Sequence, residues 1–449
     1  MADRKRPRSP SSLSLPPPPV IRLPLIIDKE LEKLCTLLAA ITDGTLAAHA
    51  LQTAYAAARA GNDAEAGRVA TTALNVAWTA LHTGHWAQVD STWRSAYMVA
   101  ALMVAQAEAF AGNTLSALRT VDLALMLGDY TFRTQLLQAA DTLEEARGTL
   151  DDQGASTVST LLAIVPSPHR RRLSGTLPPL QRLRLPSLAY FYNEFMATGT
   201  PVVLTGVLDG WPALSSRPWR DIAYLRRVVG HRTVPVEFGA HYLDEGFDEQ
   251  LMTVAQFIDE HVAVGTLAST ASPATTASPP RAYLAQHQLF EQCPRLRRDI
   301  VVPDYCQLAS DTQESDEGEE VAGSESGHGS TGEDPDSVRI NAWFGPAGTL
   351  SPLHYDRYHN LFAQVVGTKY VRLYAPEWSE SLYPHTTGPH KVSSRIIDPD
   401  DVDDAEFPKF SRAPYVDVEL NAGELLYIPP QHWHFVEAAT VSFSVSFWF

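Results

Sequence analysis

Hydrophobic and polar positions repeat with two different periods, and the change of period divides the chain into two parts. Between residues 25 and 165, apolar residues recur at helical spacing in an alanine-rich stretch that contains no proline. Trp93, Tyr97 and Val104, for example, fall on one face of a helix, where packing is the expected role of the aromatic side chains. The tripeptide Ala-Gly-Asn occurs twice and combines a glycine that ends one helix with an asparagine that caps the next. We therefore expect an antiparallel array of helices over this region.

Residues 181–449 follow the two-residue alternation of strands. Short segments rich in β-branched and aromatic residues are bounded by glycine, proline, aspartate or asparagine, as in TPVVLTGVL, VRINAWFG, YVDVEL and TVSFSVSFWF. Their spacing favours a β-sandwich or a barrel. The two parts together predict an α+β protein in which a helical array precedes a strand-rich domain.

Four segments are predicted to lie outside the packed parts. Residues 1–24 form a basic, proline-rich tail that we expect to be disordered, and residues 166–180 form a linker rich in proline, serine and arginine. Inside the strand-rich domain, residues 266–280 and 310–337 are predicted to be disordered surface inserts. The second insert holds ten acidic residues and neither lysine nor arginine. This acidic run is expected either to be solvated or to attract a basic partner.

Charge and cysteine content exclude several classes of protein. The formal net charge is −17, but much of it lies in the acidic insert, so no nucleic-acid-binding surface and no direct nucleic-acid partner are expected. Three cysteines are too few for a disulfide framework and fit a reducing compartment. The longest apolar helical run is about ten residues, against the ~20 that a membrane span needs, and the N-terminus has no signal-peptide pattern. We expect a soluble protein of the nucleus, the cytoplasm or both, since the cluster Lys5-Arg6-Pro7-Arg8 is either a nuclear import signal or a solvated end.

Candidate chemistry begins at the stretch SPLHYDRYHN. In an extended segment His354 and Asp356 point to the same side, so one imidazole and one carboxylate can bind the same ion. Near the C-terminus, YIPPQHWHFVEAA offers His432 or His434 as a third ligand, and the spacing leaves the choice between them open. Two histidines and one carboxylate on one face of an octahedron are typical of non-haem Fe(II) oxygenases, whose open positions take a chelating substrate and O₂.

A lysine downstream points to the chelating substrate. On the stretch GTKYVRLYA, alternation places Lys369 with Val371 and Leu373 on one face, opposite Tyr370 and Arg372. If the first face lines the interior, Lys369 is a buried cation that needs an anion, and a dicarboxylate such as 2-oxoglutarate would supply it. The alternative is that Lys369 lies on an exposed hairpin.

Longer motifs carry a resemblance to a known family. The stretches NAWFGPAGTLSPLHYDRYHNLFAQVVGTKYVRLYAP, LLYIPPQHWHFV and SFSVSFWF resemble the Jumonji-C (JmjC) family of Fe(II)- and 2-oxoglutarate-dependent oxygenases. One branch of the family, whose members are described both as lysine demethylases and as arginyl C-3 hydroxylases, is the most similar. The resemblance covers about residues 180–449 apart from the inserts, and the helical domain more loosely. It implies a JmjC double-stranded β-helix, which is a cupin-like jelly roll, over residues 181–449.

The resemblance implies which residues hold the metal. The Fe(II) ligands are then His354, Asp356 and His434. His432 corresponds to a position where the family needs no ligand, and His359 matches no family ligand and is expected at the pocket rim or the surface. His385 and His390 are expected to be ordinary loop residues.

The resemblance also implies a pocket for 2-oxoglutarate. Lys369 would pair with the distal carboxylate of this cosubstrate, with help from the hydroxyl of Tyr283. Asn360 would bond near the metal-chelating end, and Ser351 and Gln286 would add further contacts.

An oxygenase that hydroxylates a protein or peptide side chain is the function that the resemblance implies. We expect arginine, hydroxylated on carbon, because Glu237, Tyr242 and Trp343 match this branch and supply a carboxylate and two aromatic faces for a guanidinium. Asp356 points the same way, since many histone demethylases of the wider family have glutamate there. Alternation alone leaves open whether Glu237 faces solvent or the pocket mouth.

Three alternatives remain at this point. One is demethylation of methyl-lysine by the same mechanism, one is a non-catalytic JmjC adaptor, and one is a cupin-type metal enzyme that does not use 2-oxoglutarate. The expected substrate is a histone or another chromatin- or ribosome-associated protein. We expect a monomer, because the sequence stops directly after the last predicted strand.

Overall fold

The computed structural model describes most of the chain. The predicted inserts at 266–280 and 310–337 lie outside the described residues, as does most of the predicted tail at 1–24. The described residues are 21–24, 28–41, 43–84, 88–151, 161–162, 167, 171–244, 246–263, 281–309, 338–388 and 390–449.

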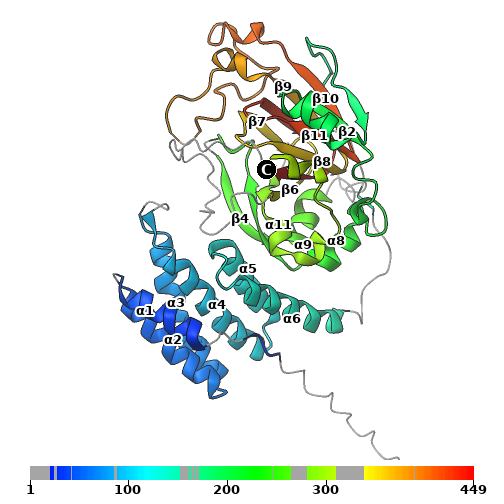
Figure 1. Cartoon of the computed structure of the whole chain (residues 1–449). Coiled ribbons are helices and arrows are strands. Elements are labelled where there is room, and N and C mark those ends of the chain that lie inside the picture. Colours follow the sequence, from blue (N-terminus) through cyan, green and yellow to red (C-terminus); the bar gives the residue numbers. More distant parts are fainter. Residues whose placement is uncertain are drawn as a thin grey trace, which may run out of the picture.

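The first part of the chain is the expected array of helices. They are α1 (Asp28–Ala39), α2 (Gly44–Arg59), α3 (Asp63–Leu81), α4 (Thr92–Phe110), α5 (Thr114–Leu127) and α6 (Arg133–Asp151). Buried alanines such as Ala70 and Ala96 fill the core, and their small side chains allow neighbouring helices to pack closely. The helices stand side by side in the lower half of Figure 1.

Both Ala-Gly-Asn sequences end a helix, as predicted. Only one of the two asparagines caps the following helix with a side-chain hydrogen bond. Gly61 and Gly112 have φ of 79° and 83°, the left-handed conformation that favours glycine after a helix. Asn62 accepts a hydrogen bond from the backbone N–H of Glu65, whereas Asn113 precedes α5 without making a cap hydrogen bond through its side chain.

The second part is a jelly roll of two sheets, as predicted. The strands are β1 (Arg182–Arg184), β2 (Val202–Thr205), β3 (Thr233–Phe238), β4 (Asp248–Thr253), β5 (Ala282–His287), β6 (Arg339–Gly345), β7 (Leu350–Tyr355), β8 (Asn360–Val366), β9 (Thr368–Tyr374), β10 (Val416–Asn421), β11 (Glu424–Ile428), β12 (Trp433–Ala438) and β13 (Ser442–Trp448). The large sheet has the order β1-β2-β11-β8-β13-β6-β5-β3-β4, and the small sheet has the order β10-β9-β12-β7. Valine, leucine and isoleucine side chains from both sheets form a shared core, so the sheets pack face to face.

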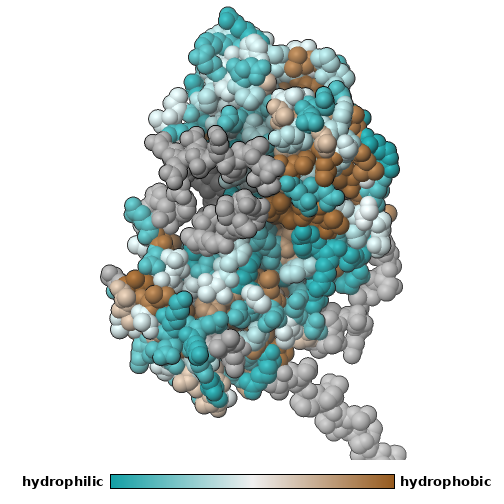
Figure 2. Space-filling view, viewed as in Figure 1, coloured by the Kyte–Doolittle hydropathy of each residue, from teal (hydrophilic) through white to brown (hydrophobic). Residues whose placement is uncertain are grey.

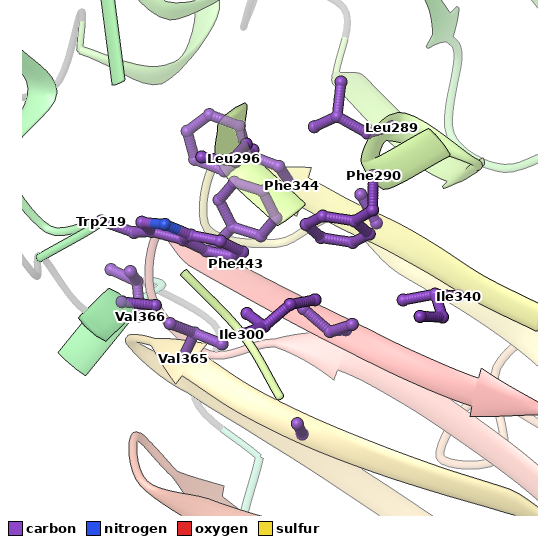
Figure 3. Packing of buried hydrophobic residues seen from close by; sticks show 14 of the residues in the cluster. Trp219, Leu289, Phe290, Leu296, Ile300, Ile340, Phe344, Val365, Val366 and Phe443 are labelled. Atoms are coloured by element: carbon purple, nitrogen blue, oxygen red, sulfur yellow. The ribbon is translucent and has the colours of Figure 1, made fainter. Parts of the chain in front are cut away.

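Short helices cover the outer face of the large sheet. Among them are α8 (Ile222–Val229), α11 (Leu289–Gln292) and α12 (Pro294–Arg297). Figure 3 shows Trp219, Phe290, Phe344 and Phe443 packed together against strands of this sheet. The Phe443 ring centroid lies 4.5 Å from that of Trp219 and 4.7 Å from that of Phe344. These aromatic contacts hold the covering helices on the large sheet, whose strands β3, β5 and β8 carry some of the candidate site residues.

The outer face of the small sheet is also buried. Arg372 on β9 is 2% exposed and donates to Asp417 on β10 at 2.9 Å. Arg171, from the segment predicted as a linker, bonds to Glu437 on β12 at 2.5 Å. The backbone N–H of Ser174 donates to Asp417 at 2.9 Å. The described part of the predicted linker therefore packs along the barrel, because its arginine and backbone groups have acidic partners there.

The surface mixes polar and apolar residues. Figure 2 shows that hydrophilic residues cover most of the visible face of the helical domain, with smaller hydrophobic areas between them. None of the helices in the described part of the chain combines the length and the apolar content that a membrane-spanning helix requires.

Candidate active site

Two neighbouring strands of the small sheet bring three possible metal ligands together. His354 on β7 and His434 on β12 are directly opposite each other in the antiparallel register, and Asp356 follows the end of β7. The possible ligand atoms of these residues all lie within 4.8 Å of one another. The Nε2 atom of His434 is 3.7 Å from the Oδ2 atom of Asp356. The His-x-Asp spacing and the strand register thus place two imidazoles and one carboxylate around a common point.

Backbone carbonyls orient both imidazoles. The Nδ1 atom of His354 is 2.7 Å from the carbonyl oxygen of Pro352, and that of His434 is 2.9 Å from the carbonyl oxygen of His432. If each Nδ1–H donates to its carbonyl, each Nε2 lone pair remains free for a metal, as in most protein sites where histidine binds a metal. The donor set of two imidazole nitrogens and one carboxylate fits Fe(II).

Burial disfavours the charged forms of Asp356 and His434. It raises the pKa of the Asp356 carboxyl, although His354 and a hydrogen bond from Asn360 lower it, and it holds the pKa of His434 well below its usual range. A divalent cation between these groups reverses both effects, because it favours the carboxylate and the neutral imidazole. The electrostatics of the three residues therefore suit a bound cation.

His432, the other candidate third ligand, lies outside this group. It precedes β12, and it follows Gln431, whose φ of 61° interrupts the extended backbone. Its ring is buried, its Nδ1 atom has no hydrogen-bond partner among the described residues, and burial lowers its pKa to about 4. The structure groups His434 with His354 and Asp356, and His432 is not a member of this group.

Lys369 lies in the interior, on the face that alternation predicted. Its neighbours on this face, Val371 and Leu373, belong to the core shared by the two sheets. Lys369 is 1% exposed, and its Nζ atom donates to the hydroxyl of Tyr283 on β5 at 3.0 Å. Burial lowers its pKa to about 7. Because no carboxylate of the described residues pairs with this ammonium, the pocket lacks one negative charge that an anionic ligand can supply.

Two of the other predicted cosubstrate residues, Ser351 and Asn360, contact residues of the site, whereas no contact of Gln286 with the site is found among the described residues. Ser351 on β7 forms a side-chain hydrogen bond to Tyr283. Asn360 on β8 is 4% exposed, and its Oδ1 atom has no hydrogen-bond partner among the described residues. Gln286 on β5 has φ of 47° and lies where the pairing of β5 with β6 is irregular. The orphaned oxygen of Asn360 and the unpaired cation of Lys369 are two separate signs that a polar ligand completes this pocket.

Glu237 lies beside this pocket on β3. Its strand neighbours Val234 and Val236 are fully buried, so Glu237 points away from the core. It stands opposite Tyr283 on β5 and Glu249 on β4, and it lines a surface hollow together with Arg281 and Tyr283. Burial and the charge of Glu249 raise its pKa to about 7. The tertiary structure thus decides the question that alternation left open, because Glu237 faces a half-buried hollow beside the site.

Tyr242 and Trp343 flank the site with different contacts. The Tyr242 hydroxyl is 2.9 Å from the Ser393 Oγ atom, and burial together with the charges of Asp356 and Glu237 raises its pKa to about 12. Trp343 on β6 is half-buried, its ring centroid is 6.2 Å from that of Tyr283, and its indole N–H donates to Ser446 at 2.9 Å. Tyr242 thus lies near Asp356 and Glu237, and Trp343 lies beside Tyr283.

The loop between β9 and β10 supplies residues that sequence reasoning missed. Ser393 forms a β-bridge with His354 and contacts Tyr242, and the ring of His390 lies 6.1 Å from that of Tyr242. His390 was expected to be an ordinary loop residue, and the structure places it at the site mouth. No sequence signal reveals these contacts, because the loop folds back on β7. His359 lies elsewhere and bonds to Tyr427 at 2.8 Å.

Comparisons with known proteins agree with this architecture. A cupin-like domain model matches residues 188–449, and a model of KDM8-like N-terminal ARM repeats matches residues 28–156. The chain is 37% identical over 384 residues to lysine-specific demethylase 8 of Danio rerio, covering 84% of this chain and 85% of that protein. It is 36% identical to lysine-specific demethylase JMJ30 of Arabidopsis thaliana, covering 88% and 89%. It is 32% identical to Jumonji C domain-containing protein 5 of Drosophila melanogaster, covering 87% and 89%.

Proposed function

Because this chain belongs to the Jumonji-C family and is a 2-oxoglutarate-dependent oxygenase, we propose that it hydroxylates a protein arginine on carbon. The observation that carries the proposal is the half-buried carboxylate of Glu237, which lies beside the site and forms no ion pair with another residue in the described part of the chain, although Arg281 lines the same hollow. A buried carboxylate next to a second carboxylate is unfavourable by itself. A cationic side chain of the substrate removes this cost.

The residues around the metal-ligand group have separate roles in this proposal. His354, Asp356 and His434 hold Fe(II), and Lys369 with Tyr283 holds the distal carboxylate of 2-oxoglutarate. Iron, 2-oxoglutarate and O₂ supply the oxidising chemistry when they are bound, whereas the protein positions the target carbon and excludes water. Asn360, with one free oxygen and an amide that bonds to Asp356, orients groups beside the metal.

Arginine fits the substrate hollow better than a fully methylated lysine. A guanidinium offers N–H donors in a plane, so it can bond to the Glu237 carboxylate through two hydrogen bonds. Its planar face can also stack on an aromatic ring such as that of Tyr242. A trimethyl-lysine has no N–H donor, and the Glu237 carboxylate would remain without a hydrogen bond.

Demethylation of methyl-lysine is the second candidate. It is favoured by the relatives from Danio rerio and Arabidopsis thaliana, which bear the name lysine-specific demethylase. Both reactions use the same metal and cosubstrate, and they differ in which carbon of the substrate faces the metal. Oxidation of an N-methyl carbon would release formaldehyde, whereas oxidation of an arginine side-chain carbon leaves a stable alcohol.

Product analysis is expected to separate the two reactions. Peptides that contain arginine should gain the mass of one oxygen atom in reactions with Fe(II), 2-oxoglutarate, ascorbate and O₂. Matched methyl-lysine peptides should release no formaldehyde. Mass spectrometry measures the first product and a formaldehyde assay the second. Formaldehyde from methyl-lysine together with unmodified arginine peptides would overturn the arginine proposal in favour of demethylation.

Peptide affinity is expected to depend on pH through Glu237. The guanidinium binds the ionised carboxylate, and the pKa of Glu237 is raised to about 7. The KM for an arginine peptide should therefore be nearly constant above about pH 7 and rise by about tenfold per pH unit below it. The variant Glu237→Gln should have a high KM that lacks this pH dependence. Steady-state kinetics between about pH 6 and about pH 8 test this, and an identical pH profile in wild type and variant would remove Glu237 from the substrate site.

The proposed substrate is a histone or another chromatin- or ribosome-associated protein, met in the nucleus or the cytoplasm. Candidate peptides should contain an arginine in an extended, accessible segment, because the hollow beside Glu237 is only half-buried. A monomeric state and the lack of a nucleic-acid partner stay predictions of the sequence.

A further inference from the structure

The strand that carries Glu237 is β3, and its first half has no neighbouring strand on the side that faces β5. Side chains occupy that place. β3 pairs with β4 along its whole length, from Thr233 to Phe238. Its pairing with β5 covers only Glu237 and Phe238. β4 is the last strand of the sheet, so pairing with β4 alone does not fix β3 relative to the barrel. The first half of β3 needs another attachment.

Asp122 of the helical domain supplies that attachment. It lies on α5 and is fully buried. Its Oδ2 atom accepts a hydrogen bond of 2.7 Å from the backbone N–H of Thr233. Its Oδ1 atom accepts two hydrogen bonds from Arg232, at 2.9 Å and 2.6 Å. The carboxylate therefore holds both the first residue of β3 and the residue before it. In Figure 1, α5 lies directly below the end of the sheet that carries β4.

The carbonyl of Thr233 has a side-chain partner as well. Gln292 on α11 donates to it at 2.8 Å, and the Gln292 Oε1 atom is 2.6 Å from the Nε2 atom of His287 on β5. The N–H and C=O of one strand residue point to the same side. Asp122 and Gln292 thus occupy the place that a neighbouring strand would take. These two side chains connect α5 with β3 and β5. Glu237 lies on β3, and Tyr283 lies on β5.

Stability alone is a poor explanation for this arrangement. A buried ion pair such as Asp122–Arg232, with exposures of 0% and 2%, gains little net stability over apolar side chains of similar volume. What it provides is a fixed geometry, since each carboxylate oxygen has a defined donor. Here that geometry is imposed four residues before Glu237 on the same strand.

We propose that Asp122 is a positioning residue for substrate binding, through which the helical domain sets the placement of Glu237 at the mouth of the active site. The inference rests on the proposed function of Glu237. Asp122 does not touch the substrate. It fixes the start of β3, so that the Glu237 carboxylate meets the cationic side chain of the substrate in the correct position. The helical domain is then part of the substrate site of the oxygenase.

The substitution Asp122→Asn in the full-length chain tests this inference. An amide has one acceptor atom where the carboxylate has two, so either Thr233 or Arg232 loses its hydrogen bond to this side chain, although Arg232 keeps its ion pair with Glu144. We expect the KM for an arginine peptide to rise by about tenfold, because a displaced carboxylate weakens binding. The kcat at saturating peptide, the KM for 2-oxoglutarate and the turnover of 2-oxoglutarate without peptide should stay within about twofold of wild type, since the metal and Lys369 are held by the small sheet.

A control at the same interface separates positioning from simple loss of contact between the domains. Asp141 on α6 pairs with Arg295 on α12 at 3.2 Å, and among the described residues it forms no ion pair or hydrogen bond with β3. Asp141→Asn is expected to lower the Tm without changing the KM for the peptide. A second test variant, Gln292→Met, removes the hydrogen bond to the carbonyl of Thr233 from the other side and should also raise the KM for the peptide.

The outcomes decide between the possibilities. A raised peptide KM in Asp122→Asn, with an unchanged KM in Asp141→Asn, supports the inference. If Asp122→Asn does not fold, the peptide KM of Gln292→Met, compared with that of Asp141→Asn, tests the inference instead. Wild-type peptide KM in the folded variants would overturn the positioning role. Failure of the proposed function looks different, because the wild-type protein itself would then leave arginine peptides unmodified.

Discussion

Alanine at His354, Asp356 or His434 is expected to abolish turnover of 2-oxoglutarate, and each single substitution should be as damaging as the others. The reason is geometric, because the three ligand atoms share one centre and lie within 4.8 Å of one another. Two remaining ligands hold a catalytic divalent metal poorly, and the chemistry depends entirely on that metal. The loss should be seen both as absent succinate and as a lowered iron content of the purified protein.

His432→Ala and His359→Ala are the matched controls for this prediction. His432 is two residues from His434 in sequence but outside the ligand group, and His359 bonds to Tyr427 and lies 5.5 Å, between ring centroids, from Phe449. Both variants should keep most of the turnover when measured well below their Tm, although removal of a buried ring is expected to lower that Tm. Loss of iron from His432→Ala, with iron retained by His434→Ala, would show that the ligand assignment is wrong.

Lys369→Ala is expected to raise the KM for 2-oxoglutarate by about one to three orders of magnitude, because loss of one partner of a buried ion pair costs about 3–5 kcal/mol. Iron binding should survive, since Lys369 lies outside the ligand group. Initial rates of succinate formation across a range of 2-oxoglutarate concentrations give the KM, and metal analysis gives the iron content. An unchanged KM would contradict the role of Lys369 as the anchor of the cosubstrate.

Arg372 provides the comparison for this buried lysine. It lies three residues away on the other face of β9 and is equally buried, but it has its own carboxylate partner in Asp417. Arg372→Met should therefore lower the Tm strongly and leave the KM for 2-oxoglutarate almost unchanged. The opposite pattern is expected for Lys369→Met. The pKa of Lys369 is lowered to about 7 in the fold, so its burial costs stability at neutral pH without a cosubstrate, and its removal should not lower the Tm of the cosubstrate-free protein.

Much of the site follows from local sequence pattern. Alternation along β9 predicted that Lys369 shares a face with Val371 and Leu373, because successive residues of a strand point to opposite faces whatever the rest of the fold does. The spacing of His354 and Asp356 likewise predicted that they share a side. Helical periodicity predicted the array and the buried stripe of Trp93 and Tyr97, which are 7% and 3% exposed, since helix and strand periods are local properties of the backbone.

Other features depend on which segments become neighbours. The register of β12 against β7 places His434, and not His432, opposite His354. The 171–177 segment and the acidic residues near Asp400 cover the side of β9 that carries Arg372. Strand alternation does not predict that this face is buried by other segments. The position of Glu237 at a hollow depends on how β3 joins the sheet.

The sequence by itself therefore determined the types of element, the faces of its strands and the residue types of a metal and cosubstrate site. The tertiary structure decided which histidine lies beside His354 and Asp356, the surroundings of Glu237 and the attachment of β3 to Asp122, which is 111 residues away in sequence from Thr233. The physical reason is that a side chain's face is set by local backbone geometry, whereas its partners are set by the packing of distant segments, which no local period encodes.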